Sequence, residues 1–379
     1  MDFIVKEIDN KHVLWLQNKN QYLITDSFFF KIIQLINVGK SKAELIDYCL
    51  TELFLSNEKS ELIVAACLKL KVENKVGSTS IENETFQNIE LSKQPDYISY
   101  TYQYNSKYIN VQFSNEKLAK RIHPKFQYLC ENSLEGARLG GHIFVQEIGG
   151  TYSLFSNDTC IGQWKESDFH FFLGKISMTL LNLFNDTKEE DWLAVLHASA
   201  VCKNNKALIF LGVSGSGKST AITILSLNEF ELLADDFVPI HAKYQKAVSF
   251  PAAISVKESL HQEFEKQFPN LKNEPIRKKN SQIKFKYLYP TNEAQQKSKF
   301  VSTNALIFIK YDKNGEDKLT ELSSLKTLEK LIPDSWISPL PKNVPTFLDW
   351  IVGVPCYELV YSENDFLLNV SNKLIANDF

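Results

Sequence analysis

The sequence lacks the features that would mark a secreted, membrane-spanning or nucleic-acid-binding protein. Its six cysteines are scattered, with no C-x-x-C pair and no histidine at metal-ligand spacing, so neither a disulfide framework nor a zinc site is indicated. No apolar run approaches the roughly 18 residues of a membrane span, and residues 1–7 hold no basic segment followed by an apolar one. The net charge of −3 gives no electrostatic attraction to nucleic acid or an anionic membrane. We therefore expect a cytoplasmic protein with reduced thiols and without a nucleic-acid or membrane partner.

Glycine is scarce as well, yet three of the chain's 14 glycines fall within residues 212–217. They belong to G-V-S-G-S-G-K-S-T at 212–220, which follows the apolar run A-L-I-F-L at 207–211. The pattern predicts a buried strand, a tight turn whose backbone N–H groups point at phosphate oxygens, and a helix whose N-terminus favours anions. We expect Lys218 to reach the β- and γ-phosphates of ATP and the Ser219 hydroxyl to bind Mg²⁺. The predicted nucleotide-binding residues are Gly212, Ser214, Gly215, Ser216, Gly217, Lys218, Ser219 and Thr220.

Two adjacent carboxylates follow the next predicted strand. The segment Glu231–Ala234 leads into Asp235 and Asp236, and Asp235 stands 17 residues after Lys218. In an open α/β sheet the carboxyl ends of the strands face the crevice that holds the nucleotide, so both acids should lie beside the transferred phosphate. We expect Asp235 to be the general base and Asp236 the Mg²⁺ ligand, and the reverse assignment stays open.

Upstream, the run Leu193–Val201 is apolar except for His197 and Ser199, and it predicts a strand beside the one that precedes the glycine-rich turn. On general grounds, a single histidine in such a run is a satisfied core residue. Over residues 192–240, however, L-H-A-S-A-V, G-V-S-G-S-G-K-S-T and A-D-D-F-V-P-I resemble, in order, the catalytic domain of HPr kinase/phosphorylase and HPr-kinase-like proteins. The resemblance implies a P-loop core related to phosphoenolpyruvate carboxykinase and ATP-dependent phosphorylation of a protein serine. It also implies a catalytic role for His197 beside Asp235.

The chain departs from classical HPr kinases in two places. Thr220 stands where they have a glutamate, and no arginine-glycine signature loop follows, which weakens the expectation of a reverse phosphorylase reaction. Arg277 or Lys279 could stabilise charge on the leaving phosphate, as arginine fingers do, or their segment could be a solvated loop. Both residues belong to the dense basic cluster Arg277, Lys278, Lys279, Lys284 and Lys286.

Residues 1–75 predict a small winged-helix-like α+β domain. It would contain two short strands near 13–16 and 22–24 and three helices: 28–36 capped by Asp26 or Ser27, one behind the capping box Ser41–Glu44, and 58–70. The pattern resembles PqqD-like modules, which hold leader peptides during ribosomal peptide maturation. A generic helical domain remains an alternative.

The remaining segments complete the predicted organisation. Residues 76–96 are polar and aperiodic, as in a linker. Alternating residues predict antiparallel strands in a β-rich middle region at 97–190, which ends in a helix containing Phe169, Phe172, Ile176 and Leu180. The catalytic domain would cover 191–379.

Together these patterns predict an α/β protein with a P-loop core of the HPr kinase/phosphoenolpyruvate carboxykinase type. The leading hypothesis is a kinase that uses ATP and Mg²⁺ to phosphorylate a hydroxyl, expected to be serine, of a peptide or protein substrate such as a ribosomal peptide precursor. A small-molecule kinase and a non-catalytic, ATP-gated binding or regulatory protein are the alternatives. The sequence leaves a homo-oligomer open.

Overall fold

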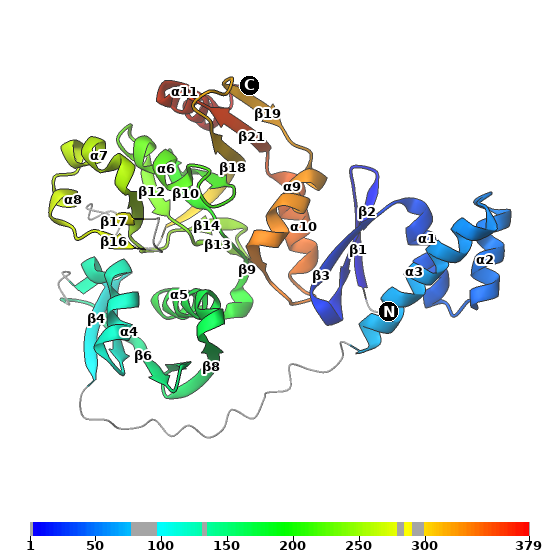
Figure 1. The fold of residues 1–379 in the computed structure, drawn as a ribbon, viewed down its shortest axis with the longest axis horizontal. Helices are drawn as coiled ribbons and strands as arrows, with labels where there is room; N and C mark the ends of the chain where they lie inside the picture. Colours follow the sequence, from blue (N-terminus) through cyan, green and yellow to red (C-terminus); the bar gives the residue numbers. More distant parts are fainter. Residues whose placement is uncertain (1–2, 77–96, 131–134, 279–283, 290–298, 379) are drawn as a thin grey trace. The chain divides into compact units, whose positions relative to one another are not determined.

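The computed structural model describes residues 3–76, 97–130, 135–278, 284–289 and 299–378, and it is a mixed α/β structure with several sheets (Figure 1). The chain forms two compact units. Unit 1 comprises residues 1–85, 323–329 and 338–353, and unit 2 comprises residues 86–322, 330–337 and 354–379. Two segments late in the chain therefore belong with the N-terminal unit. Apart from residue 76, the expected linker lies outside the described residues.

Unit 1 contains a three-stranded antiparallel sheet. Its strands are β1 (Phe3–Ile8), β2 (Lys11–Leu16) and β3 (Gln21–Thr25), with β2 in the centre. The two expected strands are confirmed as β2 and β3. The pattern did not reveal β1, because this edge strand has one fully buried residue, Ile8.

Three helices follow the sheet, as the sequence predicts. They are α1 (Ser27–Asn37), α2 (Lys42–Thr51) and α3 (Asn57–Val76). Asp26 caps α1 by accepting a hydrogen bond from the Phe29 N–H at 2.8 Å, and Ser41 and Glu44 form the predicted capping box of α2. The helices and β2 share one apolar core, made by Leu14, Ile32, Ile33, Ile36, Leu45, Cys49, Val64 and Cys67.

Segments from the C-terminal part of the sequence complete unit 1. They are the start of α9 (Ser324–Leu331) and all of α10 (Val344–Gly353). The ring centroids of Tyr22 and Phe347 lie 5.8 Å apart, and Lys6 forms an ion pair with Asp349. These contacts join α10 to the three-stranded sheet.

The β-rich part of unit 2 is a five-stranded sheet with strands in chain order. The strands are β4 (Ile98–Tyr104), β5 (Lys107–Phe113), β6 (Arg138–Ile148), β7 (Thr151–Ser156) and β8 (Thr159–Lys165). The prediction of antiparallel strands is wrong for one pair, because β5 and β6 are parallel. The intervening segment, with α4 (Glu116–Ile122) and the short turn η2 (His123–Lys125), carries the chain back before β6 begins. The predicted helix is α5 (Phe169–Asn185), which buries Phe172, Ile176 and Leu180.

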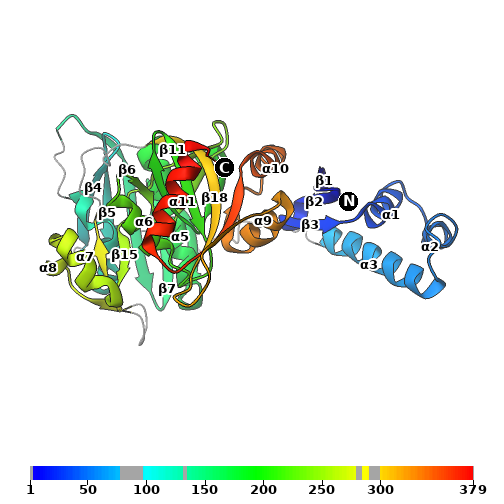
Figure 2. The ribbon, with the colours of Figure 1, turned by 90° about the horizontal axis from the view of Figure 1, so that it is seen from above.

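A ten-stranded sheet forms the rest of the framework. Its strands are β9 (Trp192–Leu196), β10 (Ser199–Lys203), β11 (Lys206–Leu211), β12 (Glu231–Ala234), β13 (Val238–His241), β14 (Lys246–Val248), β18 (Phe300–Tyr311), β19 (Lys318–Glu321), β20 (Ser335–Ile337) and β21 (Cys356–Tyr361). The main path is β12-β10-β11-β18-β14-β13-β9-β20, and β21 pairs with both β18 and β19. Helices α6 (Lys218–Ser226) and α11 (Asn364–Ala376) pack on this sheet beside β11 and β18 (Figure 2).

The single strand expected over 193–201 is wrong. The segment forms two strands, β9 and β10, separated by a turn at His197 and Ala198 in which the Ala198 N–H donates to the Leu196 carbonyl at 2.9 Å. Strand β10, not β9, lies beside β11. Because of this turn, His197 lies at the edge of the sheet instead of inside it.

A smaller sheet covers one side of the framework. Its strands are β15 (Ile254–Lys257), β17 (Lys284–Leu288) and β16 (Arg277–Lys278), and it is accompanied by α7 (His261–Gln267) and α8 (Asn270–Asn273). Among the helices in the described ranges, none combines the length and apolar content that crossing a bilayer requires.

Candidate functional site

Strand directions bring the candidate residues to one edge of the large sheet. Strands β11 and β12 both run antiparallel to β10, so their carboxyl ends lie at the same edge as the start of β10. Strand β9 ends there too, because Leu196 pairs with Val238 at the start of β13. The loop after β11, the β9–β10 turn and the β12–β13 turn therefore meet, and these carry residues 212–217, His197 and the two aspartates.

The loop of residues 212–217, called the glycine-rich loop below, depends on its glycines. Gly212, Gly215 and Gly217 have φ values of 142°, 94° and 105°, which side chains rarely allow. A Cβ on Gly212 would lie 2.7 Å from Ser216 Oγ and 2.9 Å from the carbonyl oxygen of Ile309. The loop is fixed to β18 by a hydrogen bond of 2.9 Å from the Tyr311 N–H to the Ser216 carbonyl.

The start of α6 fits an anionic ligand. The N-cap residue of this helix is Gly217, which has no side-chain acceptor for the first N–H groups, and these groups lie at the positive end of the helix, where an anion is favoured. The buried Lys218 ammonium donates to the Gly212 carbonyl and lies 3.5 Å from the Val213 carbonyl, inside the loop. Ser216 Oγ is buried and has no hydrogen-bond partner among the described residues, and Lys257 Nζ lies 3.8 Å from where a Gly215 Cβ would stand. Lysine and hydroxyl groups around an uncapped helix start can hold phosphate.

Asp235 is a buried carboxylate held by three donors. Its Oδ1 accepts hydrogen bonds from the hydroxyls of Ser199 at 2.6 Å and Ser219 at 2.9 Å, and its Oδ2 accepts one from the Ser255 N–H at 3.3 Å. Burial, followed by the neighbouring charge of Asp236, raises the pKa of Asp235, and the bonds from Ser199 and Ser219 oppose that rise.

Asp236 has a different environment. It has φ 67°, and its side chain is 56% exposed. His197 Nε2 lies 3.0 Å from Asp236 Oδ1, and Lys125 Nζ lies 3.8 Å from Oδ2. The two adjacent aspartates thus point to different partners: Asp235 to the serine at the start of α6, and Asp236 to an exposed histidine and a lysine.

The residues present suit a Mg²⁺ ion that is shared with a nucleotide. Ser219 Oγ and Asp235 Oδ1 are neighbours at the start of α6. Within the described ranges, no group of three His, Cys, Asp or Glu side chains could hold a metal ion. Mg²⁺ keeps several waters and commonly binds through one or two protein oxygens together with substrate phosphates.

Arg277 lies at the start of β16 and packs on the ring of Tyr287. Its guanidinium carbon lies 5.4 Å from the centroid of the Tyr287 ring. Burial first, and then the charges of Asp236 and Asp235, raise the pKa of Tyr287, while the Arg277 charge lowers it. The charges of the arginine and of both carboxylates therefore all act on the Tyr287 hydroxyl. Lys279 lies outside the described residues.

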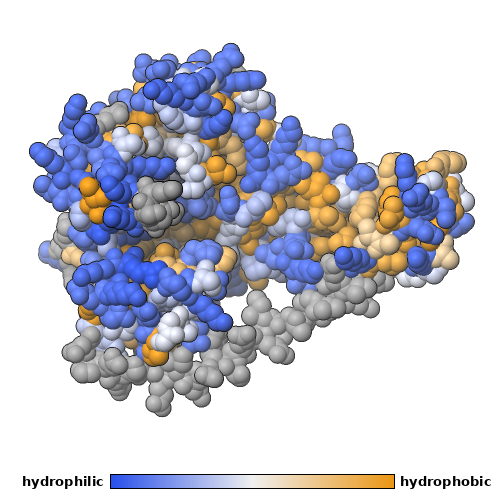
Figure 3. Space-filling view, in the orientation of Figure 1, coloured by the Kyte–Doolittle hydropathy of each residue, from blue (hydrophilic) through white to orange (hydrophobic). Residues whose placement is uncertain are grey.

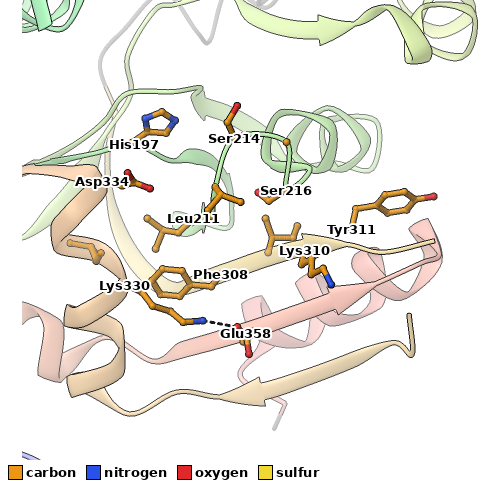
Figure 4. A pocket seen from close by; sticks show the side chains of 15 residues that line it. His197, Leu211, Ser214, Ser216, Phe308, Lys310, Tyr311, Lys330, Asp334 and Glu358 are labelled. Carbon is orange, nitrogen blue, oxygen red and sulfur yellow. Dashed lines mark hydrogen bonds and ion pairs between the residues drawn. The ribbon is translucent and has the colours of Figure 1, made fainter. Parts of the chain in front are cut away.

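A cavity of about 500 Å³ opens beside the glycine-rich loop (Figure 4). His197, the loop and the end of β18 line it, together with Lys330, Asp334 and Glu358. Lys330 Nζ donates to Glu358 Oε1 at 2.6 Å and lies 5.2 Å from the centroid of the Phe308 ring. The volume is in the range of small-molecule sites. Because His197 lines the same cavity as the loop, a ligand on the loop can reach it.

Sequence reasoning missed three polar residues near this edge. Ser199 was visible as the second polar residue of its apolar run, but no role was assigned to it. Lys125 and Lys257 gave no local signal, because only the fold brings η2 and the end of β15 close to the loop and the aspartates.

Comparison of the chain with protein-family models and with curated proteins gave no match.

Proposed function

We propose that the protein is an ATP-dependent kinase that transfers the γ-phosphate to a hydroxyl group, expected to be serine, of a peptide or protein. The observation that carries the proposal is the meeting, at one sheet edge, of the glycine-rich loop, the partly buried Ser219–Asp235 pair and the exposed His197–Asp236 pair. A nucleotide-binding protein without catalysis would not need the second pair. The order of these motifs also supports a core of the HPr-kinase-like P-loop type.

The two aspartates have separate roles in the proposed reaction. Asp235 would hold Mg²⁺ with Ser219, because its carboxylate already accepts the Ser219 hydrogen bond. Asp236 would be the general base, because it is exposed and lies 3.0 Å from His197. This proposal reverses the assignment expected from the sequence. When bound, Mg²⁺ would neutralise charge on the β- and γ-phosphates.

The proposed transfer balances without any other reactant. A bond forms between the acceptor oxygen and the γ-phosphorus, and the bond between the γ-phosphorus and the β–γ bridging oxygen breaks, leaving ADP. The hydroxyl proton passes to Asp236. His197, which lies beside this carboxylate, can orient it and share the proton. Lys218 and the N–H groups of the glycine-rich loop hold the phosphates in place.

Unit 1 supports a peptide or protein acceptor over a small metabolite. Its helices and their connections expose large apolar side chains, including Phe28, Val38, Phe54 and Leu62, which are 62%, 75%, 87% and 65% exposed. Figure 3 shows apolar surface gathered over these helices. Such a surface suits the apolar side chains of a peptide, and a kinase for a small metabolite has no use for it.

The test follows label from γ-labelled ATP with Mg²⁺ in a lysate of the source cells, separated into polypeptide and small-molecule fractions. We expect wild type to label a polypeptide and Lys218→Ala to lose ATP binding. Asp236→Asn should bind ATP within about twofold of wild type but transfer about 10²- to 10⁴-fold more slowly. Asp235→Asn should raise the Mg²⁺ concentration needed for half-maximal rate, which Asp236→Asn should not.

The labelling experiment needs a control variant outside the proposed site. Asp168→Asn, at an aspartate in the turn before α5, should leave binding and transfer unchanged. Label confined to a small molecule would favour a metabolite kinase. Tight ATP binding without any transfer would contradict the proposal and favour an ATP-gated binding protein.

A further inference from the structure

The turn η2 of the β-rich part is fixed against the catalytic edge. The Ala253 N–H donates to the Lys125 carbonyl at 2.9 Å, and the Tyr289 hydroxyl donates to the Pro124 carbonyl at 3.1 Å. Both donors belong to the segment around the small sheet β15–β17–β16. These backbone contacts give η2 a defined position beside the proposed active site.

Aromatic packing continues this connection to the aspartates. Phe126, directly after η2, meets Phe250 edge-to-face with ring centroids 6.0 Å apart, and Phe250 lies 4.5 Å from Phe237. All three rings are buried, and Phe237 directly follows Asp236. A rigid apolar contact therefore sets the distance between η2 and the β12–β13 turn.

The side chain that η2 presents to this turn is Lys125. Its Nζ lies 3.8 Å from Asp236 Oδ2, on the carboxylate oxygen that does not face His197, and its side chain is 25% exposed. The separation is long for a hydrogen bond, so the ammonium keeps donors for another ligand. The flexible stem of lysine lets the charge move by the small distance that a phosphoryl group would require.

The charge distribution of the edge indicates what such a ligand would be. Lys218 and Lys257 lie at the glycine-rich loop, whereas Asp236, the proposed base for the acceptor hydroxyl, puts negative charge on the side of the acceptor. In phosphoryl transfer, charge spreads over three equatorial oxygens and needs cations on more than one side. Lys125 can supply one from the side of the aspartates.

We propose that Lys125 is a catalytic residue contributed by the β-rich part of the chain, and that its ammonium contacts the transferred phosphoryl group while it orients Asp236. This inference rests on the proposed kinase function. It makes the β-rich part a component of the catalytic apparatus.

The test compares Lys125→Met, Lys125→Arg and Lys175→Met in the full chain. Lys175 is a matched control, because it is 28% exposed and forms an ion pair with Glu189 in the same unit. Mg·ATP is the probe for binding. The phosphate acceptors are water and the polypeptide fraction that the wild-type protein labels. Urea midpoints show whether each variant is folded.

We expect Lys125→Met to lower kcat about 10²- to 10³-fold, as loss of one transition-state donor does, with the KM for ATP and the ATP affinity within twofold of wild type. Lys125→Arg should recover at least tenfold of this loss, because it keeps the positive charge. Lys175→Met should have less than a twofold effect.

Three results would overturn the inference in distinguishable ways. If wild type transfers label and Lys125→Met retains more than half of the wild-type kcat, only the role of Lys125 is refuted. If wild type transfers no label, the proposed function fails and the inference fails with it. If Lys125→Arg lowers kcat as much as Lys125→Met does, the positive charge at this position is not what matters. This result would also refute the role of Lys125.

Discussion

The hydrogen bond from Ser199 to Asp235 should be a measurable source of both stability and order at the site. Ser199 Oγ is fully buried and donates to Asp235 Oδ1 at 2.6 Å. A hydrogen bond to a charged group contributes about 1.5–3 kcal/mol, and one between neutral groups about 0.5–1.5 kcal/mol. At a pH where Asp235 is ionised, we expect Ser199→Ala to lower the free energy of unfolding of unit 2 by about 1.5–3 kcal/mol.

A double-mutant cycle separates this bond from the loss of the hydroxyl itself. In an Asp235→Asn background the serine would donate to a neutral amide oxygen, so Ser199→Ala should cost only about 0.5–1.5 kcal/mol there. The coupling between the two substitutions should then be about 1 kcal/mol.

The pH dependence gives a second check with a defined sign. Removing the Ser199 bond raises the folded-state pKa of Asp235 further, in the direction already set by burial and Asp236. Relative to wild type, the variant therefore loses stability where Asp235 is ionised. The difference should shrink as the pH falls and the carboxyl takes up its proton in both proteins.

Urea unfolding followed by tryptophan fluorescence measures these differences, since Trp164, Trp192 and Trp336 lie in unit 2. The urea midpoints should be compared with one shared slope for all variants, because free energies extrapolated to zero urea carry errors of about 10–15%. Equal effects of Ser199→Ala in both backgrounds, at pH 8 and at pH 4, would refute the argument that this bond stabilises a buried charge.

Two further predictions concern the loop and the β-rich part. Gly212→Ala should destabilise unit 2 by about 1–3 kcal/mol and weaken ATP binding at least tenfold, because of its φ and the 2.9 Å approach to the Ile309 carbonyl. In calorimetric titrations and urea unfolding the control Gly174→Ala, with nothing within 4 Å of the new Cβ in α5, should leave binding unchanged and stability equal or higher. The hydrogen bond from Arg121, then that from Tyr152, lowers the pKa of Glu166 to about 2, so its contribution is present above about pH 4.5 and is lost as the pH falls through about 2. Glu166→Gln should therefore lower the urea midpoint at pH 7 but progressively less toward pH 3, and a gap that is constant with pH would contradict this account.

Local chemistry made several parts of the fold predictable. The apolar run 207–211, the glycines after it and the residues of α6 specify a strand, a tight turn and a helix within 20 residues, and the structure contains them in that order. The capping box at Ser41 and Glu44 is equally local, because both of its hydrogen bonds join residues three positions apart.

The turn at His197 was not predictable from its neighbourhood. A run that is apolar except for His197 and Ser199 is compatible with one long strand, and only the pairing of β9 with β13 and of β10 with β11 and β12 divides it. The same pairing decides that His197 meets Asp236 and not Asp235. Sequence order could not distinguish two adjacent aspartates, because their different burial arises from strands that are distant in the chain.

The sequence by itself determined the glycine-rich loop, the acidic pair after a buried strand and the presence of three helices near the N-terminus, since each depends on residues close together in the chain. Tertiary structure alone decided which aspartate contacts Ser219, that Lys125 reaches the edge from the β-rich part, and that α10 belongs to unit 1. These relations join residues separated by 16 to more than 300 positions. Such contacts are selected by the packing of whole sheets and helices, which no local pattern of residue types records.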